Sequence, residues 1–129
     1  MKRLLLLTAV LLLAPSLSAD IVPMCIAPLV AHVRKPLMGI ASYYGDGWEG
    51  KTMANGKPFN KHKLTAASYD IPLGKHIKVR NMENDRVIEV VITDRGPNHR
   101  LHRLIDISEA GADRLGYKHQ GLTLVSIEE

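Results

Sequence analysis

Short alternations of apolar and polar residues recur along the last two-thirds of the chain, and this pattern predicts half-buried β-strands. Turn residues separate the runs, with Gly45-Asp46-Gly47 after the first and Asn84-Asp85 as a hairpin between the third and fourth. A small domain buries more apolar surface when its sheet closes on itself. Six short strands therefore favour a mainly β, six-stranded barrel over residues 38–129. The predicted strands are residues 39–44, 64–68, 76–80, 87–92, 104–107 and 122–127.

One segment has the signals of a short helix, from Ser108 to Leu115. Ser108 is a good N-cap, Glu109 lies in the first turn where a negative charge is favourable, and Gly116 is placed to end the helix. We therefore expect one or two short helices beside the barrel.

The N-terminal residues have the pattern of an export signal. Lys2 and Arg3 precede an apolar run, residues 4–14, and a small residue stands before a cleavage site after Ala19. The run is short for a transmembrane helix, although a retained N-terminal anchor is the alternative. We expect residues 1–19 to be a signal peptide and the protein to be exported to the periplasm or cell envelope, or secreted.

Residues 20–37 contain three prolines and predict an extended leader. The single cysteine, Cys25, raises the question of a lipid anchor. A lipidation site needs a small residue before the cysteine, and Pro23 and Met24 fit badly. We expect a soluble exported chain with one free thiol and no internal disulfide.

The net positive charge of the chain is small. It has 17 Lys and Arg against 13 Asp and Glu, and loss of Lys2 and Arg3 would leave 15 against 13, a net charge of +2. No basic block interleaved with aromatics occurs, so we expect no nucleic-acid partner.

The run Val90 to Pro97 carries the candidate chemistry. A buried strand ends in Asp94 and Arg95 just before Gly-Pro stops it. A carboxyl group held at a strand end, open to a cleft and near a cation, can act as a general acid or base. The alternative is an ordinary Asp–Arg pair that closes a turn. Arg95 is expected to orient Asp94 or a nearby backbone carbonyl.

Several other side chains have both a possible functional role and a structural one. Tyr43, Tyr44 and Trp48 form an aromatic cluster suited to stacking on sugars, although one tyrosine must face the core. His99 and His102 with Asp94 and Asp106 match no strong metal signature, so neither a metal nor another cofactor is expected. Asp106 and Ser108 are assigned structural roles.

Seven segments carry recognisable motifs in order, at residues 39–45, 50–56, 64–67, 71–74, 93–97, 104–108 and 110–116. Together they resemble the rare lipoprotein A (RlpA) family of bacterial envelope proteins, whose domain is a double-psi β-barrel. The resemblance implies lytic transglycosylation of peptidoglycan, which leaves 1,6-anhydro-N-acetylmuramic acid ends, with Asp94 as the single acid/base. It also implies that the partner is the peptidoglycan glycan strand, and we expect a monomer.

The sequence departs from the family pattern at two polar positions. Lys57 stands where the family usually has Glu, and Ser68 where it usually has His. A lysine beside Asp94 would lower the pKa of that carboxyl and weaken it as an acid. Glu49 and Asp70 are the alternative sources of a carboxylate in the cleft. Besides Asp94, the expected substrate-binding or site-shaping residues are Tyr44, Trp48, Asn55, Lys57, Ser68 and Arg95.

Three functions remain open from the sequence. The first is a lytic transglycosylase that works through Asp94. The second is a non-catalytic, expansin-like glycan-binding barrel, in which Lys57 and Ser68 mark lost chemistry. The third is an envelope or secreted protein that uses the barrel as an interaction scaffold. A fold alone does not decide among them.

Overall fold

The computed structural model describes residues 35–129, and the predicted signal peptide (1–19), Cys25 and most of the predicted leader (20–37) lie outside them. Residues 35 and 36 have no regular structure, and the first strand begins at Leu37. The strands are β1 (Leu37–Tyr44), β2 (Thr65–Ala67), β3 (His76–Asn81), β4 (Val87–Asp94), β5 (Ile105–Ser108) and β6 (Thr123–Glu128). Each of the six predicted strands is present.

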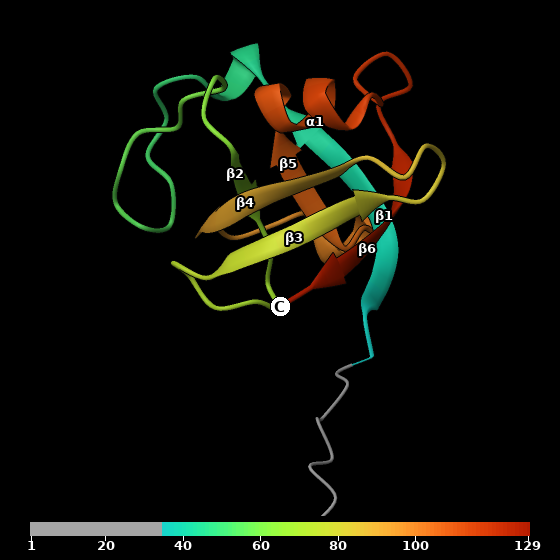
Figure 1. Ribbon diagram of the computed structural model, residues 1–129. Helices are drawn as coiled ribbons and strands as arrows, with labels where there is room; N and C mark the ends of the chain where they lie inside the picture. The colour runs from blue at the N-terminus through green and yellow to red at the C-terminus, as the bar shows by residue number, and fades with distance from the viewer. Residues whose placement is uncertain (1–34) are drawn as a thin grey trace, which may run out of the picture. The chain divides into compact units, whose positions relative to one another are not determined.

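The six strands close into a barrel in the order β1-β5-β2-β4-β3-β6 (Figure 1). The β1–β5 and β2–β4 pairs are parallel, and the other four pairs are antiparallel. Strands that are neighbours in sequence are therefore mostly separated in the sheet, and only β3 and β4 form a simple hairpin. The predicted mainly β, six-stranded barrel is confirmed.

The barrel interior is filled by the apolar positions of the alternating runs. On β3, Ile77 and Val79 are buried while the residues before and between them are exposed. Ile105 and Ile107 on β5 point inward in the same way, on either side of the half-buried Asp106. Asp106 therefore lies on the opposite face of β5 from the core, because successive side chains of a strand alternate.

The helix α1 (Glu109–Leu115) has the predicted ends. The Ser108 hydroxyl accepts a hydrogen bond from the Gly111 N–H at 3.4 Å, and Gly116 ends the helix in the left-handed conformation. Figure 1 shows α1 across the end of the barrel toward which β1 and β5 run. Two single-turn 3-10 helices, η1 (Asp46–Trp48) and η2 (His99–Leu101), complete the elements.

One row of residues across four neighbouring strands positions the candidate site. Ser42 on β1 is the register partner of Asp106 on β5, and Asp106 is the partner of Ala67 on β2. Ala67 in turn pairs with Asp94 on β4, after a register shift that follows Ala66. Residues in register share a face of the sheet, so both carboxyl groups lie on one face with the small Ala67 between them.

Candidate active site

Asp94 is the last residue of β4, as the sequence predicts, and it is half-buried. Its Oδ1 atom accepts two backbone hydrogen bonds, from the Ala54 and Arg95 N–H groups, each at 2.8 Å. Within residues 35–129, no hydrogen bond reaches its second oxygen, Oδ2. The backbone thus holds the carboxyl group in one orientation and leaves one oxygen free to exchange a proton.

Asp94 lines a pocket of about 210 Å³ at the surface of the barrel. Its walls come from β1, η1, β2, the end of β4 and the start of β5, so the pocket exists only in the folded barrel. The lining residues are Ser42, Tyr43, Tyr44, Trp48, Ala67, Asp94, Arg95, Arg103 and Asp106. We call this the active-site pocket.

Asp106 is a second carboxyl group in this pocket, and sequence reasoning gave it only a structural role. The Ser42 hydroxyl donates a short hydrogen bond to its Oδ1 atom. Burial raises the pKa of Asp106 above its ordinary value, against the opposing effects of the Ser42 hydrogen bond and the charge of Arg103. Its position between two inward-facing isoleucines could have indicated that it lies on the face opposite the core.

The side chain of Arg95 lines the pocket and binds a neighbouring loop, and it does not bind the Asp94 carboxylate. Its Nη1 atom donates to the Ser68 carbonyl at 2.6 Å and to the Ile71 carbonyl at 2.7 Å. This matches the second of the two expected roles, the orientation of a backbone carbonyl. Ser68 is fully buried beneath the loop, and its hydroxyl accepts a hydrogen bond from the Asp70 N–H. Ser68 thus shapes the loop and does not line the active-site pocket.

The two expected aromatic residues of the site differ in exposure. Tyr44 is buried and stacks on Phe59, with ring centroids 4.2 Å apart. Burial, with the negative charges of Asp94 and Asp106, raises the pKa of Tyr44 to about 12, so it remains a neutral wall of the pocket. Trp48 is 54% exposed, and the Lys51 ammonium lies 4.6 Å from its ring centroid.

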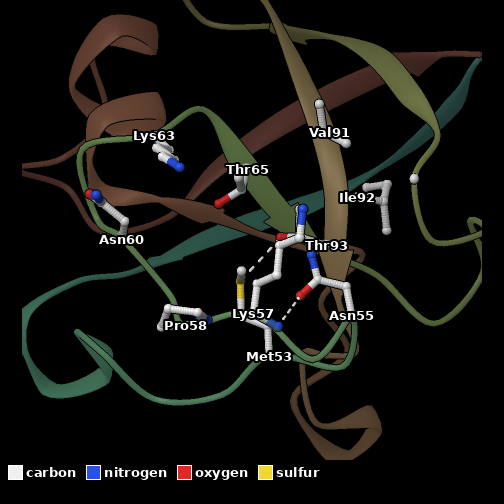
Figure 2. A pocket seen from close by; sticks show the side chains of 11 residues that line it. Met53, Asn55, Lys57, Pro58, Asn60, Lys63, Thr65, Val91, Ile92 and Thr93 are labelled. Carbon is white, nitrogen blue, oxygen red and sulfur yellow. Dashed lines mark hydrogen bonds between the residues drawn. The ribbon is translucent and has the colours of Figure 1, made fainter.

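The structure does not bring Asn55 and Lys57 into the active-site pocket. Both residues line a second pocket, and the Lys57 N–H donates to the Asn55 side-chain oxygen at 3.0 Å (Figure 2). No ion pair joins Lys57 to Asp94 among residues 35–129. The Glu49 carboxylate accepts from the Lys61 N–H and is not a pocket residue.

The histidines of the η2 segment do not assemble a metal site. His99 stacks on the exposed Tyr69, with ring centroids 4.2 Å apart. Within the described range of 35–129, no group of three or more His, Cys, Asp or Glu side chains is arranged to hold a metal ion. No helix in the same range is long and apolar enough to cross a membrane.

The sequence model of a double-psi β-barrel family described as "Lytic transglycolase" matches residues 37–127, nearly the whole described domain. The chain belongs to this family. The match includes residues of all six strands of the barrel and both carboxyl groups of the pocket.

Curated relatives named endolytic peptidoglycan transglycosylase RlpA share this domain. The protein from Rickettsia prowazekii is 45% identical over 93 residues, which are 70% of this chain and 29% of the relative. The protein from Campylobacter jejuni is 38% identical over 101 residues, 78% of this chain and 36% of the relative. The protein from Pseudomonas aeruginosa strain UCBPP-PA14 is 37% identical over 92 residues, 71% of this chain and 27% of the relative. This chain therefore spans about a third of the length of these relatives.

Solved structures share the barrel at low sequence identity. The Streptomyces papain inhibitor superposes with a TM-score of 0.55 at 21% identity, covering 74% of this chain and 96% of the inhibitor. The apo expansin of Clavibacter michiganensis superposes with a TM-score of 0.56 at 20% identity, covering 73% of this chain and 50% of the expansin. These likenesses show the double-psi β-barrel fold.

Proposed function

We propose that this domain is a lytic transglycosylase that cleaves the glycan strands of peptidoglycan and leaves 1,6-anhydro-N-acetylmuramic acid ends. The observation that carries the proposal is Asp94, a pocket residue whose Oδ1 is fixed by two backbone N–H groups and whose Oδ2 accepts no hydrogen bond among residues 35–129. The support from comparison is membership of the lytic transglycolase family and the names of the RlpA relatives.

One carboxyl group suffices for the two proton transfers of this reaction. Asp94, protonated on Oδ2, gives its proton to the glycosidic oxygen as the bond from that oxygen to C1 breaks. The C6 hydroxyl of the same sugar then bonds to C1, and the Asp94 carboxylate takes the hydroxyl proton. The acid is regenerated, no water is consumed, and the products are an anhydro end and a new free hydroxyl.

Asp106 has a supporting role in this proposal. Glycoside cleavage develops positive charge at C1 in an oxocarbenium-like transition state. Asp106 lies across Ala67 from Asp94, so its ionised carboxyl would face that charge from the other side of the bound sugar. Arg95, by holding the loop at Ser68 and Ile71, maintains the wall beside Asp94.

The test is product analysis with Asp94→Asn. Purified protein is incubated with peptidoglycan, both intact and stripped of stem peptides, and anhydro products are measured by mass spectrometry. The variant keeps the shape of the side chain but transfers no proton, so the rate should fall by about 10²–10⁴-fold. Asp113→Asn, an exposed change on α1 outside the pocket, is the matched control and should keep full activity. Wild-type protein that forms no anhydro product would contradict the proposal.

A glycan-binding, expansin-like function is the second candidate, and one observation favours it. Trp48 presents an exposed indole at the edge of the pocket, where a sugar ring can stack. Co-sedimentation of the protein with glycan, without anhydro product, would identify this function. Neither product nor co-sedimentation would leave the third candidate, the interaction scaffold.

We also propose that residues 1–19 direct export, that the protein acts in the cell envelope as an unlipidated monomer, and that the reaction needs no cofactor. The family membership and the relatives' names support an envelope location. Mass spectrometry of protein from its native host should find an N-terminus at Asp20. An acylated Cys25 at the N-terminus would contradict the proposed processing.

A further inference from the structure

The two carboxyl groups of the active-site pocket are held in the same manner. Asp94 accepts hydrogen bonds from the Ala54 and Arg95 N–H groups through Oδ1, and Asp106 accepts from the Ser42 hydroxyl through its own Oδ1. Among residues 35–129, no hydrogen bond reaches the Oδ2 atom of either carboxyl group. Each group thus has one anchored oxygen and one oxygen left for reaction, and the proposed proton transfers use only that of Asp94.

Small residues form the floor between the two carboxyl groups. Ala67 is the register partner of both aspartates. Gly96 lies beside it, since a Cβ atom at Gly96 would be 3.7 Å from the Ala67 Cβ and 3.8 Å from Asp106 Oδ2. The Oδ2 atom of Asp106 therefore lies next to the turn that follows Asp94. A methyl group and a glycine leave more room above this floor than larger side chains would.

The strand order sets the distance between the two carboxyl groups. The register shift between β2 and β4 places Asp94 opposite Ala67, and β2 separates β4 from β5. Two strand spacings set the backbones of Asp94 and Asp106 about 10 Å apart, with both side chains on one face. Glycosidases that retain configuration hold their carboxyl groups about 5–5.5 Å apart, and those that invert it about 6.5–9.5 Å apart, which leaves room for a water molecule. The spacing here fits the wider arrangement.

The surroundings of Asp106 suit a group that takes up a proton. Burial raises the pKa of Asp106, against the Ser42 hydrogen bond and the charge of Arg103, and a carboxylate with a raised pKa is a stronger base. Ser42 is itself fixed, because its carbonyl accepts from the hydroxyl of the fully buried Tyr117 at 3.0 Å. The orientation of Asp106 is thus supported from the core.

We propose that the active-site pocket has a second activity, the hydrolysis of glycan strands by a water molecule that Asp106 activates as general base. This inference rests on the proposed function, from which it takes Asp94 as the acid. It extends the substrate class to strands whose C6 hydroxyl is blocked by an ester, because those strands cannot close an anhydro ring but can still react with water.

The hydrolytic step uses both unanchored oxygens. Asp94 Oδ2 gives its proton to the glycosidic oxygen, and the bond from that oxygen to C1 breaks with its electron pair left on the oxygen. The water oxygen bonds to C1 while Asp106 Oδ2 takes a proton from the water. The products are a free hydroxyl and a reducing end. Asp94 is then ionised and Asp106 protonated, and proton exchange with solvent restores both.

The two routes differ in the face of the sugar that is attacked. The C6 oxygen of a β-linked sugar reaches C1 from the face that the leaving oxygen occupied, so its proton returns to Asp94. Water reaches C1 from the opposite face, where Asp106 lies across Ala67 from Asp94. Hydrolysis therefore inverts the configuration at C1 and gives the α-anomer first.

The test uses stripped glycan strands, either unmodified or 6-O-acetylated on muramic acid, in water labelled with heavy oxygen. Mass spectrometry distinguishes anhydro ends from hydrolysed ends, which are heavier by one water and carry the label. Wild type should give labelled ends from acetylated strands, and early NMR spectra should show the α-anomer. No labelled ends, or the β-anomer first, would overturn the inference.

Asp106→Asn should change the ratio of the two products. Loss of the charge slows both routes, whereas loss of the base slows only hydrolysis, so the ratio of hydrolysed to anhydro ends from unmodified strands should fall by about 10²-fold or more. Asp113→Asn, the same change on α1 outside the pocket, should keep the wild-type ratio. An unchanged ratio in Asp106→Asn would overturn the role of Asp106.

Chemical rescue guards against a variant that merely fails to fold. Azide is an anionic nucleophile that needs no base, so Asp106→Ala with sodium azide should cleave acetylated strands again and form the α-glycosyl azide. Rescue would show that the rest of the site is intact and that the missing function is the base. Failure of azide to restore cleavage in a variant with the wild-type circular dichroism spectrum would contradict the assignment.

The failure of this inference can be separated from failure of the proposed function. Anhydro ends without labelled ends would leave the transglycosylase standing and remove the hydrolytic activity. Labelled ends without anhydro ends would keep the hydrolytic activity and remove the transglycosylase. Asp94→Asn should lose both kinds of end, because the two routes share this acid.

Discussion

Asp94 and Asp106 lie on two strands that are not neighbours, and both are register partners of the same residue, Ala67. Neighbouring strands are about 4.8 Å apart, so one intervening strand sets the two backbones about 10 Å apart. Their separation is thus determined by backbone hydrogen bonding rather than by flexible side chains. The pair is as rigid as the barrel, which suits a site that must hold a sugar between two carboxyl groups.

The raised pKa of Asp106 should be visible in the pH dependence of the free energy of unfolding. Burial raises its pKa above the ordinary value of 3.8, so the folded protein binds this proton more tightly than the unfolded chain does. The resulting contribution to stability is complete below the unfolded pKa and is lost as pH rises through the folded pKa. We therefore expect the free energy of unfolding of wild type, relative to Asp106→Asn, to fall as pH rises above 3.8.

Urea denaturation of both proteins across about pH 3–7 measures this difference. A difference that stays flat, or that grows with pH, would show that Asp106 is not desolvated in the folded protein. Asp113→Asn serves as the control, since its carboxyl group is exposed on α1.

Replacement of Trp48 should separate glycan binding from folding. The indole is 54% exposed at the pocket edge, so Trp48→Ala removes a stacking surface without opening the core. We expect weaker co-sedimentation with peptidoglycan, by about fivefold, because a stacked aromatic contributes about 1 kcal/mol. The melting temperature should be unchanged. Leu122→Ala, another exposed apolar truncation away from the pocket, should leave co-sedimentation as it is.

Arg95 should stabilise the folded protein as well as hold the wall of the site. Arg95→Met removes the guanidinium that donates to the Ser68 and Ile71 carbonyls, and the loop loses both bonds. We expect a loss of about 1–2 kcal/mol in the free energy of unfolding, since each such bond contributes about 1 kcal/mol. Urea denaturation measures it, with Arg100→Met on the exposed η2 segment as the control. Equal stability of Arg95→Met and wild type would show that solvent replaces both bonds.

Gly111 is required by the close packing of α1 on β5. A Cβ atom at this position would lie 2.4 Å from the Ile107 side chain, well inside the contact distance. Alanine favours helix by up to about 1 kcal/mol, but overpacking a core costs about 1–3 kcal/mol, so Gly111→Ala should lower the melting temperature. Gly47→Ala meets no atom within 4 Å and is the matched control. A Gly111→Ala protein as stable as wild type would mean that α1 can shift.

The local features of this protein were predictable because short-range physics determines them. The alternation over residues 76–80 fixes β3, and Ser108 and Gly116 fix the ends of α1. Asp94 at a strand end followed from the apolar run before it and the Gly-Pro after it. In each case the decisive interactions lie within a few residues of one another along the chain.

The assembly of the site was harder to predict from the sequence, because it depends on pairing between strands that are distant in the sequence. Nothing local to Asp106 shows that β2 lies between β5 and β4, and so its position beside Asp94 was missed. Lys57 was expected near Asp94, yet it lines a second pocket that does not include Asp94. Ser68 was expected to bind substrate or shape the site; it is fully buried and outside the pocket, and its carbonyl, hydroxyl and N–H bind Arg95, Asp70 and Asp94.

The interleaved strand order has a consequence for how the proposed activity would be lost on unfolding. The active-site pocket draws residues from β1, β2, β4 and β5, and β2 contributes only three residues to hold the two acidic strands together. No single hairpin or half-barrel contains the site. A partly unfolded form therefore cannot retain a weakened version of the chemistry, and heat inactivation should follow the same cooperative transition as loss of the β-sheet.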